Sequence, residues 1–323
     1  MVEKYRQYIS GDSVILPYGL TEIEDNAFNG CTSVAHIEIP DSVTLIGHQS
    51  FLECSSLAEI EIPNSVTEIG SNAFWGCSGL SCIEIPNSVK KIGYGAFKDC
   101  ISLTGIKIPS SVIEIENGAF NGCSNLDSIV VQKGNPVYVS KENCLLDKES
   151  ETILFAGCKY SIIPQGVTII NEHAFEGHTG LTSIKIPDSV TKIGCGSFAS
   201  TGLMSIIIPD SVKVIEQFAF SGCFALEKCD IPECVLEIKD EAFSDCPVLK
   251  EIYLRYNNPT EAALNGFCFD VYSEIIDEWG GYRQDYYKED QFHNISLIVP
   301  IGAGYAYRHH HFFSLFKEVL PIL

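Results

Sequence analysis

Prolines recur every 23 residues along this chain, and this spacing constrains the fold more than any other feature of the sequence. The prolines fall in two series, at positions 17, 40, 63, 86 and 109 and at positions 164, 187, 209 and 232. One step in the second series is shortened to 22 residues. A fixed period of roughly 20 to 50 residues is typical of proteins that stack one structural unit on the next. The sequence therefore predicts a repeat protein.

Each unit carries its apolar residues at the same places. Counted from the proline, an aliphatic residue lies three places on, isoleucine six places on, phenylalanine eleven places on and, in most units, cysteine fourteen places on. The phenylalanines are Phe28, Phe51, Phe74, Phe97, Phe120, Phe175, Phe198, Phe220 and Phe243. Because a straight segment cannot turn all these side chains toward one core, each unit is expected to fold back on itself as one coil.

The local pattern predicts how one coil is built. The alternating I-x-I-P segment predicts a short strand, S-V-T-E-I-G predicts a second extended piece, and S-N-A-F-W-G-C fits a helical turn behind a Ser/Asn start. A single coil buries too little apolar surface to offset the entropy of ordering its residues. A stack of coils is expected to be stable, since neighbours bury each other and pair their strands.

The pattern L-x-x-I-x-I-P-x-x-V-x-x-I-x-x-x-A-F-x-x-C resembles the BspA-like, or Treponema-type, leucine-rich repeat of bacterial surface antigens, which also occurs in some protozoa. The resemblance covers residues 17–132 and 164–255. It implies a leucine-rich repeat solenoid, a right-handed α/β superhelix with short parallel strands on its concave face and short extended or helical turns on its convex face. Members of the family are regarded as cell-surface or secreted modules for adhesion and protein binding, without catalytic residues.

The period breaks at residues 133–163 and resumes at Pro164. Within the break, N-P-V-Y-V-S, N-C-L-L-D and T-I-L-F-A-G-C read as strands separated by the polar turns K-E-N and K-E-S-E, which predicts a β-hairpin insert. Since the repeat is unchanged on the far side, we expect residues 1–323 to form a single solenoid domain.

A second departure spans residues 256–293, where acidic residues alternate with aromatic ones. Residues 294–323 follow as a C-terminal cap, in which S-L-I-V-P restates the strand and G-Y-A-Y-R-H-H-H-F-F-S-L-F-K-E-V-L-P-I-L resembles the closing helix of the family. One interpretation of the aromatic insert is an end cap that shields the last core layer. The other is a ligand-binding loop, with Trp279, Tyr286 and Tyr287 as candidate contacts, since aromatic side chains commonly anchor protein interfaces.

Charge and hydropathy exclude several classes of partner. The 42 acidic and 21 basic residues give a net charge of −21, which repels phosphate backbones and anionic lipid headgroups. No run of about 18 apolar residues could cross a bilayer, and the start M-V-E-K-Y-R-Q-Y-I-S lacks the apolar core of a secretory signal. We expect a monomer without nucleic-acid binding or membrane insertion. The family resemblance implies a surface or secreted location after removal of an export segment, and the cytoplasm is the alternative.

The 14 cysteines do not indicate a disulfide scaffold. Equivalent side chains in stacked coils lie about 4.8 Å apart, which exceeds the usual Cβ separation of about 3.8 Å across a disulfide, so the cysteine column predicts buried free thiols. No C-x-x-C or H-x-x-x-H pair is present to hold a metal. G-C-G-S-F-A at residues 194–199 matches a phosphate-binding loop only in its letters, because G-Y-G-A-F-K at residues 93–98 shows these glycines to be repeat positions. We expect no cofactor and no enzymatic activity.

The residues between the buried strand positions are expected to point into solvent, so the hydrophobic core does not determine which side chains stand there. Glu38, Glu61 and Glu84 lie two places before successive prolines, so they are expected to be cross-strand neighbours, an arrangement of like charges that destabilises a sheet. With Glu59 they predict an anionic patch suited to a basic protein segment or to calcium. The ordinary alternative is a solvated polar face. Other candidate contacts at equivalent strand positions are Lys107, Lys185 and Tyr253.

These observations predict a non-enzymatic binding scaffold that uses the concave face of a leucine-rich repeat solenoid for protein interaction or adhesion. The expected partner is a host or matrix protein that presents a basic segment. Two alternatives stay open at this point: a carbohydrate-binding surface module that uses the tyrosine-rich segment 267–292, and an intracellular interaction scaffold.

Overall fold

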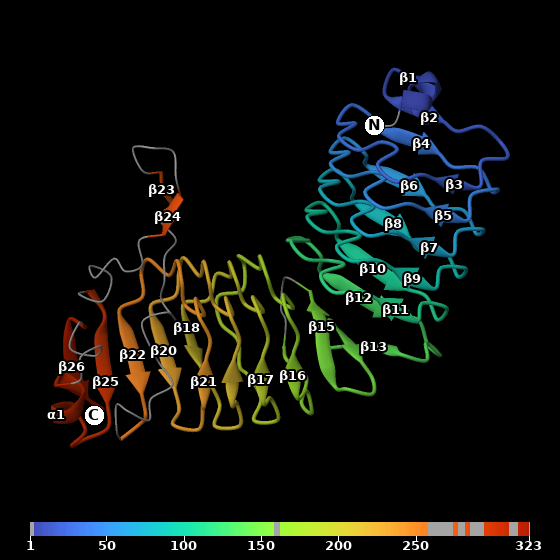
Figure 1. Cartoon of the computed structure of the whole chain (residues 1–323). Helices are drawn as coiled ribbons and strands as arrows, with labels where there is room; N and C mark the ends of the chain where they lie inside the picture. Colours follow the sequence, from blue (N-terminus) through green and yellow to red (C-terminus); the bar gives the residue numbers. More distant parts are fainter. Residues whose placement is uncertain are drawn as a thin grey trace. The chain divides into compact units, whose positions relative to one another are not determined.

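The structure is a computed structural model that describes residues 3–157, 162–257, 274–276, 282–284, 294–309 and 316–322. The chain divides into two compact units, Met1–Pro164 and Gln165–Leu323, which we call unit 1 and unit 2. Each unit is a solenoid built of stacked coils (Figure 1).

Most coils of unit 1 contribute one strand to each of two rows (Figure 1). The I-x-I-P segments form the row that we call the front strands, and the E-I pairs form the side strands. The front strands are β2 (Ser13–Ile15), β4 (His36–Glu38), β6 (Glu59–Glu61), β8 (Cys82–Glu84), β10 (Gly105–Ile108) and β12 (Ser128–Val131). The side strands are β3 (Glu22–Ile23), β5 (Leu45–Ile46), β7 (Glu68–Ile69), β9 (Lys91–Ile92) and β11 (Glu114–Ile115).

β2, β4, β6, β8 and β10 are short because a proline, which has no N–H to continue the ladder, follows each of them within two residues. β2 pairs with β4, β6 with β8 and β10 with β12, all in parallel, and the side strands form one parallel five-stranded sheet. In β4, β6 and β8 the central isoleucine is buried and its two neighbours are exposed. The predicted alternation of the strand is confirmed.

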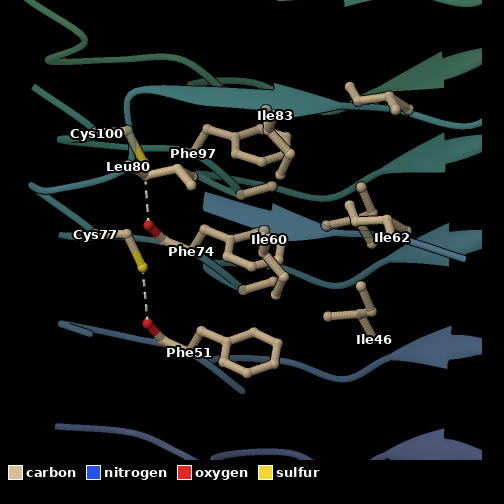
Figure 2. Packing of buried hydrophobic residues seen from close by; sticks show 14 of the residues in the cluster. Ile46, Phe51, Ile60, Ile62, Phe74, Cys77, Leu80, Ile83, Phe97 and Cys100 are labelled. Atoms are coloured by element: carbon tan, nitrogen blue, oxygen red, sulfur yellow. Dashed lines mark hydrogen bonds between the residues drawn. The ribbon is translucent and has the colours of Figure 1, made fainter. Parts of the chain in front are cut away.

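The phenylalanine turns form a third ladder between coils. The Phe74 N–H donates to the Ala96 carbonyl at 2.7 Å, and the equivalent bond recurs from Phe97 to Ala119. Because these backbones approach so closely, only alanine or serine precedes the phenylalanine. All nine rings are buried, and in unit 1 they stack with centroids 5.1 to 5.6 Å apart and planes within 10° (Figure 2). The predicted phenylalanine core is confirmed.

The turn around each phenylalanine differs from the expected helical turn. Asn72 and Gly76, on either side of Phe74, have φ angles of 56° and 73°, in the left-handed region. The equivalent residues of the preceding coil, Gln49 and Glu53, have φ angles of 54° and 58°. A right-handed helix cannot pass through such residues. The chain instead makes two tight turns, which place the phenylalanine N–H toward the next coil.

The cysteine column is buried, as predicted, at six of its seven positions, and Cys246 is half-buried. Each thiol from the second coil onward donates to the phenylalanine carbonyl of the preceding coil. In Figure 2 the Cys77 Sγ lies 3.1 Å from the Phe51 oxygen and the Cys100 Sγ lies 3.2 Å from the Phe74 oxygen. Burial raises the pKa of Cys54 to about 12, which keeps the thiol protonated as a donor.

Glycine follows the buried isoleucine of the side strand where coils approach most closely. A Cβ built on Gly70 would lie 2.7 Å from the Gly47 carbonyl carbon, and one built on Gly93 would lie 2.6 Å from the Ser71 nitrogen. No other residue fits there without moving the backbone of the preceding coil. Glycine is therefore required at these positions, whereas Glu24 and Glu116 occupy the equivalent place in the first and last coils of unit 1.

Both ends of unit 1 carry additional elements. At the start, the 3-10 helix η1 (Glu3–Tyr8) and strand β1 (Ile9–Ser10) place the Tyr5 ring 5.1 Å from that of Phe28. After the last coil, β13 (Tyr138–Lys141), β14 (Cys144–Asp147) and β15 (Thr152–Ala156) form an antiparallel meander. The predicted β-hairpin insert is confirmed, including its two polar turns.

Unit 2 repeats the two rows. Its side strands are β16 (Ile169–Ile170), β17 (Lys192–Ile193), β19 (Val214–Ile215) and β21 (Glu237–Ile238). Its front strands are β18 (Ser205–Ile207), β20 (Lys228–Ile231), β22 (Glu251–Leu254), β25 (Ser296–Val299) and β26 (Glu318–Pro321). The phenylalanine rings of unit 2 stack with centroids 4.9 to 5.3 Å apart.

The C-terminal part of unit 2 agrees with the predicted strand and differs in the helix. S-L-I-V-P forms β25, as expected. The closing helix is the five-residue α1 (Gly304–Arg308), and the strand β26 near the end of the chain was not foreseen. Two further strands, β23 (Glu274–Ile276) and β24 (Tyr282–Gln284), pair antiparallel within the aromatic insert.

Candidate interaction face

The predicted acidic residues share one face of unit 1. Glu38, Glu59, Glu61 and Glu84 are all exposed on front strands, on the opposite side from the buried isoleucines. Glu61 lies directly opposite Glu84 in the parallel register of β6 and β8. β4, which carries Glu38, packs beside β6. The structure thus brings the four carboxylates together, which we call the acidic face.

The acidic face is not neutralised by neighbouring side chains. Within the described residues, none of its four glutamates forms an ion pair. Lys107 is exposed on β10, the front strand next to β8, and it also has no ion-pair partner in the described ranges. The like charges on β6 and β8 therefore repel each other without compensation.

Exposed apolar residues lie at both ends of the same column. Ile15 is 63% exposed in register with Glu38, and Val130 is 49% exposed in register with Lys107. Sequence reasoning missed Ile15, although it lies two places before Pro17 and so belongs to the same column. From β2 to β12 the column therefore presents one apolar, three acidic, one basic and one apolar residue.

The front strands of unit 2 carry charges that are paired. Lys228 lies 3.0 Å from Glu251, and the Tyr253 hydroxyl donates to the same carboxylate at 3.1 Å. Arg255 donates two hydrogen bonds to Asp230, at 2.7 and 2.6 Å. Arg255 was missed by sequence reasoning, and the signal that marks it is its position 23 residues after Pro232, where a proline would otherwise stand.

The remaining candidate residues do not join the acidic face. Lys185 is exposed, but residues 183–185 form no strand, and Tyr253 is half-buried in β22 of unit 2. Trp279, Tyr286 and Tyr287 lie outside the described residues. Tyr256, at the start of the aromatic insert, is buried and accepts a hydrogen bond from the Tyr307 hydroxyl to its carbonyl at 3.1 Å. This contact agrees with an end-cap role for that residue.

In the part of the chain that the structure describes, no three His, Cys, Asp or Glu side chains are grouped closely enough to hold a metal ion. None of the described helices has the length and apolar character needed to cross a bilayer.

Comparisons with known proteins identify the repeat. The family model for the BspA type leucine rich repeat region matches residues 5–145 and 148–269. A leucine-rich repeat protein from Bacteroides ovatus is 30% identical, with a TM-score of 0.55, over 75% of this chain. This chain spans 63% of the length of that protein. No curated protein matches the sequence.

Two further solved structures share the fold at lower identity. The pneumococcal vaccine antigen PcpA is 20% identical, with a TM-score of 0.75, over 97% of this chain and 79% of that protein. A leucine-rich repeat protein from Eubacterium ventriosum is 21% identical, with a TM-score of 0.57, over 76% of this chain and 80% of its own length. With its repeats matched over most of the chain and its coils stacked as a solenoid, the protein belongs to the BspA-type leucine-rich repeat family.

Proposed function

We propose that the protein is a non-enzymatic adhesion scaffold at the cell surface, and that the acidic face of unit 1 binds a protein that presents a basic segment. The single observation that carries the proposal is the pair of facing glutamates, Glu61 and Glu84, neither of which forms an ion pair with any side chain in the described part of the chain. Folding gains nothing from such a pair, since like charges opposite each other destabilise a sheet. A basic partner would remove that repulsion on binding.

The column of exposed residues supports a more detailed proposal for the partner. The complement of the series Ile15, Glu38, Glu61, Glu84, Lys107 and Val130 is a segment with an apolar residue, three basic residues, an acidic residue and a second apolar residue. The column advances one coil, about 4.8 Å, at each step. Same-face side chains of an extended peptide lie roughly 6.7 Å apart, so a basic segment would match this column through the reach of its long, flexible lysine or arginine side chains and not with one residue per coil. The family and its surface antigens support a surface location for this encounter.

Substitution of the facing glutamates tests the proposal. The triple variant Glu38→Gln, Glu61→Gln, Glu84→Gln should bind a lysine-rich peptide at least tenfold more weakly than the wild type at about 0.15 M salt, since several charge contacts are lost. A matched control removes three charges elsewhere in unit 1: Glu22→Gln, Glu53→Gln, Glu68→Gln. Calorimetric binding that is equally weak in both variants would show a net-charge effect and would contradict a specific face.

The glycan-binding alternative is tested separately, because its candidate residues Trp279, Tyr286 and Tyr287 lie outside the described residues. A glycan array should give no signal with the wild-type chain if the protein-binding proposal is correct. A strong signal that disappears in Tyr286→Ala, Tyr287→Ala would establish the carbohydrate-binding module instead.

A further inference from the structure

The hairpin insert contacts the last coil of unit 1 in a way that an ordinary coil does not. In the repeats, the open edge of each coil is met by backbone groups of the next one. At the end of unit 1 the same edge is met by side chains of β13 and the turns beside it. These contacts involve Asn135, Tyr138, Ser140 and Asn143, and Phe155 from β15.

Backbone N–H groups at the open edges of β11 and β12 donate hydrogen bonds to side-chain oxygens of the insert. On the front row, the Ile129 N–H donates to the Asn143 Oδ1 at 2.9 Å and the Val131 N–H donates to the Ser140 Oγ at 3.0 Å. On the side row, the Ile115 N–H donates to the Tyr138 hydroxyl at 2.8 Å. These are the N–H groups that another coil would otherwise pair. Covering an edge in this way prevents it from recruiting a further strand.

Asn135 replaces the serine of a following repeat. In the first coils, the carbonyl of the aliphatic residue accepts a hydrogen bond from the next serine, as in Ser65 to Val43. At the last coil, the Asn135 amide donates instead to the carbonyls of Val112 and Pro109, at 2.8 and 2.9 Å. Its own oxygen accepts the N–H groups of Val137 and Tyr138, at 2.9 and 2.7 Å. Asn135 is 1% exposed, so this side chain is both buried and fully hydrogen-bonded.

The phenylalanine stack also ends at the insert. The Phe155 ring meets the Phe120 ring at 5.8 Å with a tilt of 54°, whereas successive rings within the stack are nearly parallel. Tyr5 meets Phe28 at the other end with a similar tilt of 58°. One continuous hydrophobic cluster runs from Tyr5 through the coils to Phe155. A tilted aromatic ring thus covers each end of the stack.

We propose that residues 133–157 are an internal end cap that closes unit 1, so that unit 1 stays folded when unit 2 opens. A repeat array without such a cap behaves as a series of nearest-neighbour contacts, in which loss of one coil exposes the next. The side-chain contacts that cover the open edges of β11 and β12 come from within unit 1 itself. The insert is then a structural terminator placed in the middle of the chain, rather than a decoration on one continuous solenoid.

Hydrogen exchange of the full chain, followed by mass spectrometry, tests the proposal. The variant Tyr138→Phe, Ser140→Ala, Asn143→Gly removes three cap acceptors, and glycine keeps the left-handed backbone of Asn143, whose φ is 60°. Exchange in residues 105–131 should accelerate roughly tenfold or more, while exchange in residues 205–254 stays unchanged. The control Ser150→Ala removes a bond within the insert, from the Ser150 hydroxyl to Asp147, and should change neither region.

Two results would overturn the proposal. Exchange in residues 105–131 that stays within about twofold of the wild type would show that the insert does not seal the last coil. Exchange that accelerates equally in residues 205–254 would show that both units open together, as one cooperative solenoid. Tyr138→Phe alone, which removes one hydroxyl and leaves the aromatic packing, should give the same pattern at smaller amplitude if the triple variant unfolds.

Discussion

The front strands of the two units have the same architecture, but their charges are unpaired in unit 1 and paired in unit 2. In unit 1 the glutamates of β4, β6 and β8 face solvent without ion-pair partners among the described residues. In unit 2 the charges of β20 and β22 are neutralised by the ion pairs Lys228–Glu251 and Asp230–Arg255. The scaffold does not determine the surface charge, because equivalent buried residues support both faces. Only the unpaired glutamates of unit 1 retain a like-charge repulsion that binding of a cationic partner would relieve.

The largest predicted effect tests whether the scaffolds are equivalent. Phe74→Ala in unit 1 and Phe220→Ala in unit 2 each remove a fully buried ring from the stack. Each should lower the free energy of unfolding by about 3–5 kcal/mol, because a ring-sized cavity remains. Hydrogen exchange read separately in the two units measures both losses. A loss below about 1 kcal/mol in either unit would show that its stack contributes little.

A smaller effect is expected from unpairing the face of unit 2. Arg255→Ala leaves the Asp230 carboxylate, whose side chain is 17% exposed, without its two guanidinium bonds. The variant should lose about 1 kcal/mol, since Arg255 is itself half-exposed and solvent screens the pair. It should also gain affinity for a lysine-rich peptide, which calorimetry would detect. A variant that is destabilised without binding the peptide would show that unpaired charge alone does not create a binding face.

The reverse change applies to unit 1. Glu61→Lys places a cation opposite Glu84, so that β6 and β8 carry an opposite-charge pair as the front of unit 2 does. The variant should be more stable by a few tenths to about 1 kcal/mol and should lose peptide binding. Chemical denaturation measures the first effect. A loss of stability would mean that Glu61 has a structural role that its exposure does not reveal.

The smallest predicted effect is a pH dependence in unit 2. Hydrogen bonds from Lys192 and Lys239, at 2.7 and 2.8 Å, hold the pKa of Glu216 below its ordinary value. Because the folded-state pKa is the lower one, this contribution is fully present above the unfolded value of about 4.3 and is lost as the pH falls through the folded pKa. Its size should stay below about 1 kcal/mol after screening by solvent.

A matched pair of variants isolates the Glu216 contribution. The wild type should lose more stability between about pH 6 and pH 3 than Lys192→Met, Lys239→Met, in which the pKa of Glu216 is no longer lowered. Acid unfolding followed by circular dichroism compares the two proteins. Equal acid sensitivity would assign the pH dependence to other carboxylates.

Much of the fold could be predicted because burial repeats with the period. The phenylalanines, the isoleucines of the strands and the cysteine column are fixed by the core of each unit, and their positions indicated stacked coils and parallel strands. The turn around the phenylalanine was harder to predict, because left-handed residues are evident at Asn72 and Gly76 but not at Gln49 or Glu53. There, contacts with the neighbouring coils impose a conformation that local preference does not favour.

The candidate site could be predicted only in part. Glu38, Glu61 and Glu84 follow from the strand register, since residues at equivalent places in parallel coils must be neighbours. The ion pair of Asp230 with Arg255 depends on a side chain that replaces a proline, and the pattern gives no direction for that side chain. The contact of Asn135 with Val112 keeps the 23-residue spacing of the repeat, but the repeat pattern breaks at residue 133, so the pattern does not indicate which side chain takes the place of the serine.

The ladder of hydrogen bonds between coils also determines how the molecule responds to force. Each coil is held by its two neighbours, so a pull on the chain ends would separate coils one at a time instead of shearing a whole sheet. Each released coil of 23 residues lengthens the chain by roughly 80 Å. Such a stack is expected to extend in steps under load, one coil at a time.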